Sequence, residues 1–124
     1  EFPVTATDEA LALTRTAALA ASKKSGENIV AFDVSEQLSI TDVFLIISAG
    51  NERLVGALVD AVEEALLKDG RKPVRREGDR ENRWVLLDYV DVVIHVQHDE
   101  ERTLYNLERL WKDCPTIDLE LPQP

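Results

Sequence analysis

The sequence predicts an α/β (α+β) fold, in which a mixed five-stranded sheet carries helices packed on it. Two observations lead to this prediction. β-Branched and aromatic residues dominate the stretch from Trp84 to Gln97, which is the most β-prone run of the chain. Elsewhere, segments with apolar residues at helical spacing alternate with short apolar runs, and the resulting order is α-β-β-α-β-β-β-α.

The chain is long enough for one domain. It has 124 residues, 44% of them hydrophobic, which suffices for a core without disulfides or metals. We expect residues 1–124 to form a single domain, with its core over about 5–112. The tail over 113–124 is rich in proline and alternates apolar and acidic residues, so we expect it to dock loosely or to stay flexible.

The net charge and the cysteine content limit the cellular compartment and the classes of partner that we expect. The formal net charge is −10, which argues against tight binding to nucleic-acid phosphates and favours a basic protein partner. The alternative is that the acidic surface only keeps the protein soluble. The chain has one cysteine, and it shows neither a basic-then-apolar signal pattern nor an apolar run of about 18 residues, so we expect a cytoplasmic protein without membrane contact.

The first part of the chain predicts a helix and two strands. The helix should span 5–24, capped by Thr5 or Thr7. Strands are expected over 29–34 and 43–48. The second is apolar on both faces, so it should lie centrally in the sheet.

The middle of the chain predicts a helix and an edge strand. Asn51 is a good N-cap for a helix that runs to residue 69, and Gly70 ends it. A strand over 72–77 should lie at the sheet edge because Pro73 cannot donate a backbone hydrogen bond.

One last helix is predicted over 98–112. Asp99 can cap it, and Leu104, Leu107 and Trp111 fall at positions i, i+3 and i+7.

The Trp84 to Gln97 stretch is interpreted as a β-hairpin that turns at Val90-Asp91. Because side chains alternate along a strand, six residues share one wholly apolar face: Tyr89 with Val92, Leu87 with Ile94, and Val85 with Val96. The other face carries Trp84, Leu86 and Asp88 opposite Gln97, His95 and Val93. The turn is the weak point, since valine is a poor residue where φ must be positive. A longer loop would shift this pairing.

The mixed hairpin face admits two interpretations. Trp84 could be a core residue beneath a helix or an exposed interface anchor. Asp88 across from Val93, and His95 across from Leu86, would make a poor dry core, so the pattern favours a protein-binding face. The same face could also pair with its twin across a two-fold axis, as a homodimer that must open before it meets another partner.

Catalytic signals are weak. No glycine-rich phosphate loop occurs, although the turn at Gly50-Asn51 could bind an anion at a helix N-terminus or simply be an Asn-capped turn. His95 and His98 lack a third metal ligand of suitable spacing, and Cys114 has no histidine nearby in sequence. We therefore expect no catalytic residues, no metal and no cofactor.

Several motifs resemble the ribosomal silencing factor family, also called the Iojap family. Asp33-Val34-Ser35 and Ile40-Thr41-Asp42-Val43-Phe44 resemble the family's D-V-S…I-T-D-Y-F segment. Further matches follow in order: Gly50-Asn51-Glu52-Arg53, Glu77-Gly78, Trp84 to Tyr89, Asp91 to Val96, Arg102, and Tyr105 to Trp111. The chain departs at Val43, where the family usually has Tyr, at Val90, where it usually has Gly, and after Trp111, where it usually ends.

This resemblance implies a function that is not enzymatic. Members bind the large ribosomal subunit through its protein number fourteen, block joining of the small subunit, and lower translation when nutrients are scarce, as in stationary phase. It implies a nucleotidyltransferase-like fold, so the rival hypothesis is a degenerate nucleotidyltransferase that binds a nucleotide at Gly50-Asn51. In the first hypothesis Trp84 is the anchor, and the remaining partner-binding residues are Leu86, Tyr89, His95, Glu77, Asp88 and Asp91.

Overall fold

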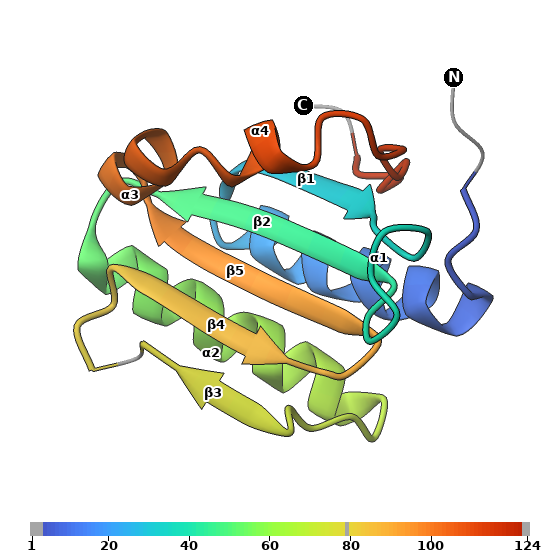
Figure 1. Cartoon of the computed structure of the whole chain (residues 1–124). Helices are drawn as coiled ribbons and strands as arrows, with labels where there is room; N and C mark the ends of the chain where they lie inside the picture. Colours follow the sequence, from blue (N-terminus) through green and yellow to red (C-terminus); the bar gives the residue numbers. More distant parts are fainter. Residues whose placement is uncertain (1–3, 79, 123–124) are drawn as a thin grey trace.

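The structure is a computed structural model that describes residues 4–78 and 80–122, and it confirms the mixed five-stranded sheet. The strand order is β1-β2-β5-β4-β3, with β2 and β5 parallel and the other neighbouring pairs antiparallel (Figure 1). The elements along the chain are α1 (Asp8–Lys23), β1 (Glu27–Asp33), β2 (Val43–Ala49), α2 (Glu52–Lys68), β3 (Arg75–Glu77), β4 (Trp84–Asp88), β5 (Val92–His98), α3 (Asp99–Tyr105) and α4 (Leu107–Leu110). As predicted, β2 lies inside the sheet, between β1 and β5.

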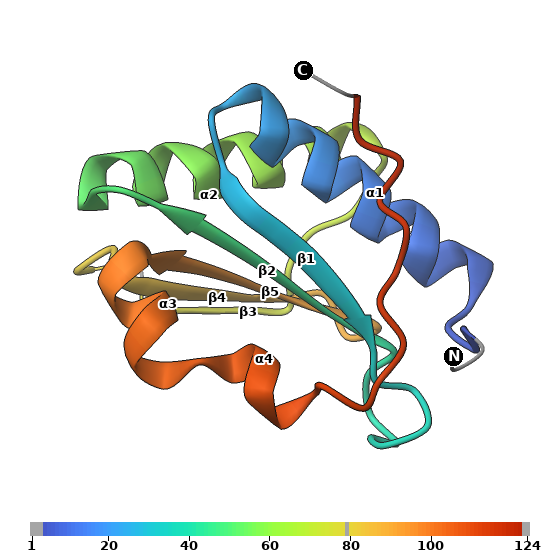
Figure 2. The same cartoon turned by 90° about the horizontal axis from the view of Figure 1, so that it is seen from above.

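Helices α1 and α2 cover one face of the sheet (Figure 2). Thr7 caps α1 by accepting a hydrogen bond from the Ala10 amide at 3.1 Å, so the helix begins later than the predicted residue 5. Asn51 caps α2 as predicted, accepting from the Leu54 amide at 2.8 Å. Apolar side chains from both helices and from β2, β4 and β5 form the main core, in which each fully buried Val, Leu or Ile contributes about 1.5–3 kcal/mol.

The β4–β5 hairpin has the predicted register. Val85 pairs with Val96 and Leu87 with Ile94, and the Tyr89 amide donates to the Val92 carbonyl at 2.9 Å. Val90 has φ 72° and the Asp91 amide donates to the Tyr89 carbonyl, an arrangement of the γ-turn type. The turn that valine disfavours is therefore present, without a longer loop.

The predicted single helix over 98–112 was wrong. Asn106 adopts the left-handed conformation with φ 43°, which asparagine tolerates better than most residues, and this divides the segment into α3 and α4. The cap is His98, not Asp99, because the His98 Nδ1 accepts the Glu100 amide at 3.1 Å.

Helix α4 lies on the sheet face opposite α1 and α2 (Figure 2). A second apolar cluster there contains buried Phe32, Val34, Ile46 and Cys114, with partly buried side chains that include Leu107 and Trp111. This helix covers the β1 side of the face, while β4 and β3 lie beyond it (Figure 1).

Both edges of the sheet are short or covered. β3 has three residues, fewer than predicted, and lies at the edge as Pro73 suggested. The C-terminal tail follows the free edge of β1: the Asp33 amide donates to the Pro115 carbonyl at 2.8 Å and the Ile117 amide to the Ala31 carbonyl at 2.9 Å. Ile117 is buried in the main core, so this part of the tail is docked.

Candidate protein-binding face

The sheet face opposite α1 and α2 carries the predicted mixed patch. We call it the Trp84 face and define it by Trp84, Leu86 and Asp88 of β4 with Val93 and His95 of β5. Trp84, Leu86 and Val93 are partly exposed. In Figure 1 no helix crosses in front of β4. The face therefore offers apolar surface that the chain itself leaves uncovered.

Trp84 is held in one orientation by its neighbours. Its indole Nε1 donates to the Nδ1 of His95 at 3.1 Å, and its ring centroid lies 4.8 Å from that of Tyr105 on α3. It is neither a fully buried core residue nor a freely rotating surface residue. An aromatic side chain fixed before binding loses little conformational entropy when a partner covers it.

His95 supports Trp84 from beneath. The imidazole is 7% exposed and its ring lies edge-on to Phe44, with centroids 5.4 Å apart. Burial lowers the pKa of His95 to about 4, so the ring is neutral at pH 7 and its Nδ1 can accept the Trp84 proton. His95 was predicted to shape the patch, and in the structure it has little exposed surface of its own.

Tyr89 does not lie on the Trp84 face. It belongs to the main core, is 7% exposed and points to the side of α1 and α2, as the strand alternation with Leu87 requires. Burial, with a smaller contribution from Glu63, raises the pKa of Tyr89 to about 12. Its inclusion with the partner-binding residues is thus corrected by the structure.

The three acidic residues differ in their surroundings. Asp88 accepts the Val90 amide at 2.8 Å, so it holds the hairpin turn, and its other oxygen lies 3.8 Å from Arg75. Glu77 forms an ion pair with Arg75 at 2.8 Å. Asp91 is exposed at the turn. The acidic rim is therefore partly neutralised within the chain, whereas no ion pair to Asp91 occurs among the described residues.

Sequence reasoning missed three exposed apolar residues on α3 and α4. Leu104 is 73% exposed, Tyr105 52% and Leu110 69%. The predicted continuous helix placed Leu104 on the core stripe, but the break at Asn106 turns it outward. Because Tyr105 contacts Trp84, these helices extend the apolar surface beyond the sheet.

Arg83 ties α3 to the rest of the molecule. Its guanidinium lies 2.7 Å from Glu52 on α2 and 2.8 Å from Glu100 on α3, and it also pairs with Glu101. The hydrogen bond from Arg83 lowers the pKa of Glu100. This exposed network fixes α3, and with it Tyr105, beside Trp84.

The Gly50-Asn51 turn has two acidic side chains beside it, one of which is paired with Arg83. The Asn51 side chain is already engaged as the α2 cap, and Glu52 and Asp99 lie beside the turn. Carboxylates at this position oppose binding of a phosphate. Among residues 4–78 and 80–122, no group of three His, Cys, Asp or Glu side chains could hold a metal ion. Within the same residues, no helix is long and apolar enough to cross a membrane.

Known proteins resemble this chain over most of its length. The sequence profile described as "Ribosomal silencing factor during starvation" matches residues 7–124. Ribosomal silencing factor RsfS of Halalkalibacterium halodurans is 41% identical over 101 residues, 82% of this chain and 86% of that protein. The Bacillus subtilis protein of the same name is 39% identical, over 84% of this chain and 88% of its own.

A solved structure has the same fold. The crystal structure of a Chromobacterium violaceum protein superposes with a TM-score of 0.79 at 28% identity, over 91% of this chain and 88% of the other. Profile, relatives and structure agree with the motifs quoted above. The chain therefore belongs to the ribosomal silencing factor family.

Proposed function

We propose that this protein binds the large ribosomal subunit through its protein number fourteen, blocks joining of the small subunit and lowers translation when nutrients are limiting. The family names support a ribosomal role. The specific partner and the steric mechanism come from the sequence resemblance, and the cytoplasm is the compartment where such a protein would act.

The observation that carries the proposal is the uncovered Trp84 face. Trp84 is orientated by His95 and Tyr105, and Leu104 on α3 and Leu110 on α4 are also exposed. Interfaces commonly combine an aromatic anchor with a polar rim, and here Asp91 and Glu77 supply acidic groups for a basic protein.

We also propose that the protein has no enzymatic activity. The Gly50-Asn51 turn is the one position that the rival nucleotidyltransferase hypothesis uses; there the Asn51 side chain is engaged as the α2 cap, and the Asp99 carboxylate opposes a nucleotide. A thermal shift assay with nucleotides and Mg²⁺ checks this. A nucleotide present at about 100 times its dissociation constant would stabilise the protein by about 2.7 kcal/mol, whereas we expect no shift.

Replacing the aromatic anchor tests the main proposal. Trp84→Ala should weaken binding to purified large subunits by at least about tenfold, because truncation of a central anchor typically costs about 2 kcal/mol or more. The measurement is co-sedimentation, with thermal melts to show that the variant is folded. Leu67→Ala, which truncates an exposed side chain on α2, is the control and should bind as the wild type does. Full binding by folded Trp84→Ala would refute the assignment.

A further inference from the structure

Arg102 of α3 is the only buried lysine or arginine among residues 4–78 and 80–122, with 8% of its surface exposed. Its Nε donates to the Glu108 Oε1 at 2.9 Å, and its Nη2 donates to the Glu108 Oε2 at 3.2 Å. The same Nη2 donates to the backbone carbonyl of Asn28 at 2.6 Å. One side chain therefore joins α3 to α4 and to β1.

The carbonyl that Arg102 contacts belongs to an irregular part of β1. The pairing of β1 with β2 shifts register between Glu27 and Val30, and Asn28 lies within this bulge with φ 49°. A bulge leaves backbone groups outside the strand ladder, and such a group takes its hydrogen-bond partner from elsewhere. Here the donor is a guanidinium 74 residues further along the chain.

The backbone of Arg102 fixes the end of α3. Its carbonyl accepts the Asn106 amide at 3.0 Å, at the left-handed residue that separates α3 from α4. Glu108 lies just beyond this break, and its carboxylate returns to the Arg102 guanidinium. The side chain and the carbonyl of one residue thus determine where α3 ends and how α4 leaves it.

Helix α3 contacts strands on both sides of β5, the strand that it follows (Figure 1). Arg102 reaches β1, whereas the ring of Tyr105 lies 4.8 Å from the ring of Trp84 on β4. Residues three apart are neighbours on a helix surface, so Arg102 and Tyr105 belong to one turn of α3. A displacement of α3 at Arg102 would therefore move Tyr105 relative to Trp84.

We infer that Arg102 is a positioning residue for the Trp84 face: it holds α3 so that Tyr105 keeps the Trp84 ring in its binding orientation. The consequence for binding rests on the proposed function. Stability alone gives little reason for an arginine here, because burial of a charge is costly and Nη1 has no hydrogen-bond partner among the described residues. An apolar side chain of similar length would fill the space but would not tie α3 to β1 and α4.

The indole N–H of Trp84 reports this positioning in the free protein. Arg102→Met removes the three hydrogen bonds and keeps a long, unbranched side chain, whereas Tyr105→Ala removes the ring beside Trp84. In proton–nitrogen NMR spectra, both variants should move the Trp84 indole signal in the same direction, because the Tyr105 ring leaves Trp84 in both.

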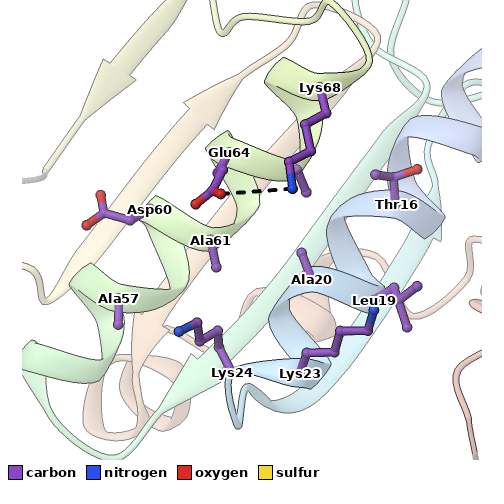
Figure 3. Close-up of a pocket in the computed structure, with 11 residues that line it drawn as sticks. Thr16, Leu19, Ala20, Lys23, Lys24, Ala57, Asp60, Ala61, Glu64 and Lys68 are labelled. Atoms are coloured by element: carbon purple, nitrogen blue, oxygen red, sulfur yellow. Dashed lines mark ion pairs between the residues drawn. The ribbon is translucent and has the colours of Figure 1, made fainter.

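Lys68→Met is the control variant. Lys68 and Glu64 form an ion pair at 4.0 Å on α2, and both side chains are exposed (Figure 3). The change therefore also removes a cation from an ion pair, but on the helix-covered side of the sheet. It should leave the Trp84 indole signal and the binding of large subunits as in the wild type.

Binding to purified large subunits provides a double-mutant cycle. Arg102→Met and Tyr105→Ala should each weaken co-sedimentation by at least about threefold, and the double variant should bind like Tyr105→Ala alone, since residues that act through one another are not additive. Losses that multiply in the double variant would show that Arg102 acts by another route and would overturn the inference.

The NMR signal gives a second way to overturn it. An unmoved Trp84 indole signal in folded Arg102→Met would make the arginine a structural residue only. If Arg102→Met does not fold, Glu108→Ala removes two of the same hydrogen bonds from a side chain that is 36% exposed, and it should move the same signal. Full binding by Trp84→Ala would instead refute the proposed function and with it the role in binding. The indole signal would still show whether Arg102 positions Trp84, because it is measured without the ribosome.

Discussion

Val90 has the least favourable backbone of the hairpin. Its φ of 72° lies in the left-handed region, which β-branched residues rarely adopt, and its side chain is 52% exposed. Val90→Gly should raise the free energy of unfolding by about 1 kcal/mol, because relief of strain exceeds the entropy cost of glycine. Urea unfolding measures this. Val90→Ala, which keeps the Cβ atom, should gain much less; an equal gain would show that the strain does not come from the backbone.

Asp33 joins the start of the chain to β1. Burial acts to raise its pKa, but hydrogen bonds from Ser35 and from the backbone amides of Ala6 and Thr5 together lower the pKa below the ordinary 3.8. A carboxylate with a lowered pKa in the folded state stabilises the fold above its unfolded-state pKa, and that contribution disappears as the pH falls through the folded-state pKa.

Because the folded state lowers the pKa of Asp33, the effect of Asp33→Asn on the free energy of unfolding should depend on pH. The variant should lose about 1–3 kcal/mol of unfolding free energy at neutral pH, since backbone donors lose their charged acceptor. The difference from the wild type should shrink below about pH 4. Denaturation at neutral and acid pH tests this, with Asp69→Asn at an exposed site as control. A difference that stays constant with pH would contradict the role of the charge.

At the scale of elements, α3 and α4 present apolar residues that packing does not use. Leu104 and Leu110 are exposed, so the double variant Leu104→Ala/Leu110→Ala should leave the melting temperature nearly unchanged. If the helices take part in the proposed interface, the same variant should weaken large-subunit binding several-fold. Binding equal to the wild type would confine the interface to the sheet.

At the scale of the molecule, the layers separate two surfaces, the Trp84 face and the helix-covered side. Rim charges steer encounter more than they hold a complex together. Asp91→Lys should therefore slow association with large subunits and flatten its salt dependence, while dissociation changes little. Stopped-flow kinetics at low salt and at physiological salt measure both rates. At physiological salt the Debye length is about 8 Å. Asp69→Lys, on the α2 side, should leave them unchanged. Asp88→Lys is a poorer probe because Asp88 also holds the hairpin turn.

Strand alternation allowed much of this architecture to be predicted from sequence. The hairpin register and the Asn51 cap depend on local patterns, and both were confirmed. The break at Asn106 was not predictable in the same way, because apolar spacing continues through it and only the backbone conformation reveals it. The tail's docking depends on hydrogen bonds to β1, over 80 residues away in sequence.

The candidate site was predicted from the sequence only in part, again because local patterns do not determine long-range contacts. Alternation placed Trp84, Leu86 and Asp88 together, but it also assigned Tyr89 to the core face, and the structure agrees with that assignment. His95 is buried beside Phe44 and Trp84, and Leu104 is exposed where the helix breaks at Asn106, neither of which spacing along the sequence encodes.

The positions of the two tryptophans give this chain a built-in optical reporter. Trp84 and Trp111 are its complete set, and each contacts the Phe44–His95 aromatic pair on the same side of the sheet. Excitation of indole therefore samples this side of the molecule and not the helical layer. A ligand that docks over Trp84 should alter the emission spectrum, whereas a ligand that binds on the side of α1 and α2 should leave it nearly unchanged. The intrinsic tryptophan fluorescence of the unlabelled protein therefore reports which of its two surfaces is occupied.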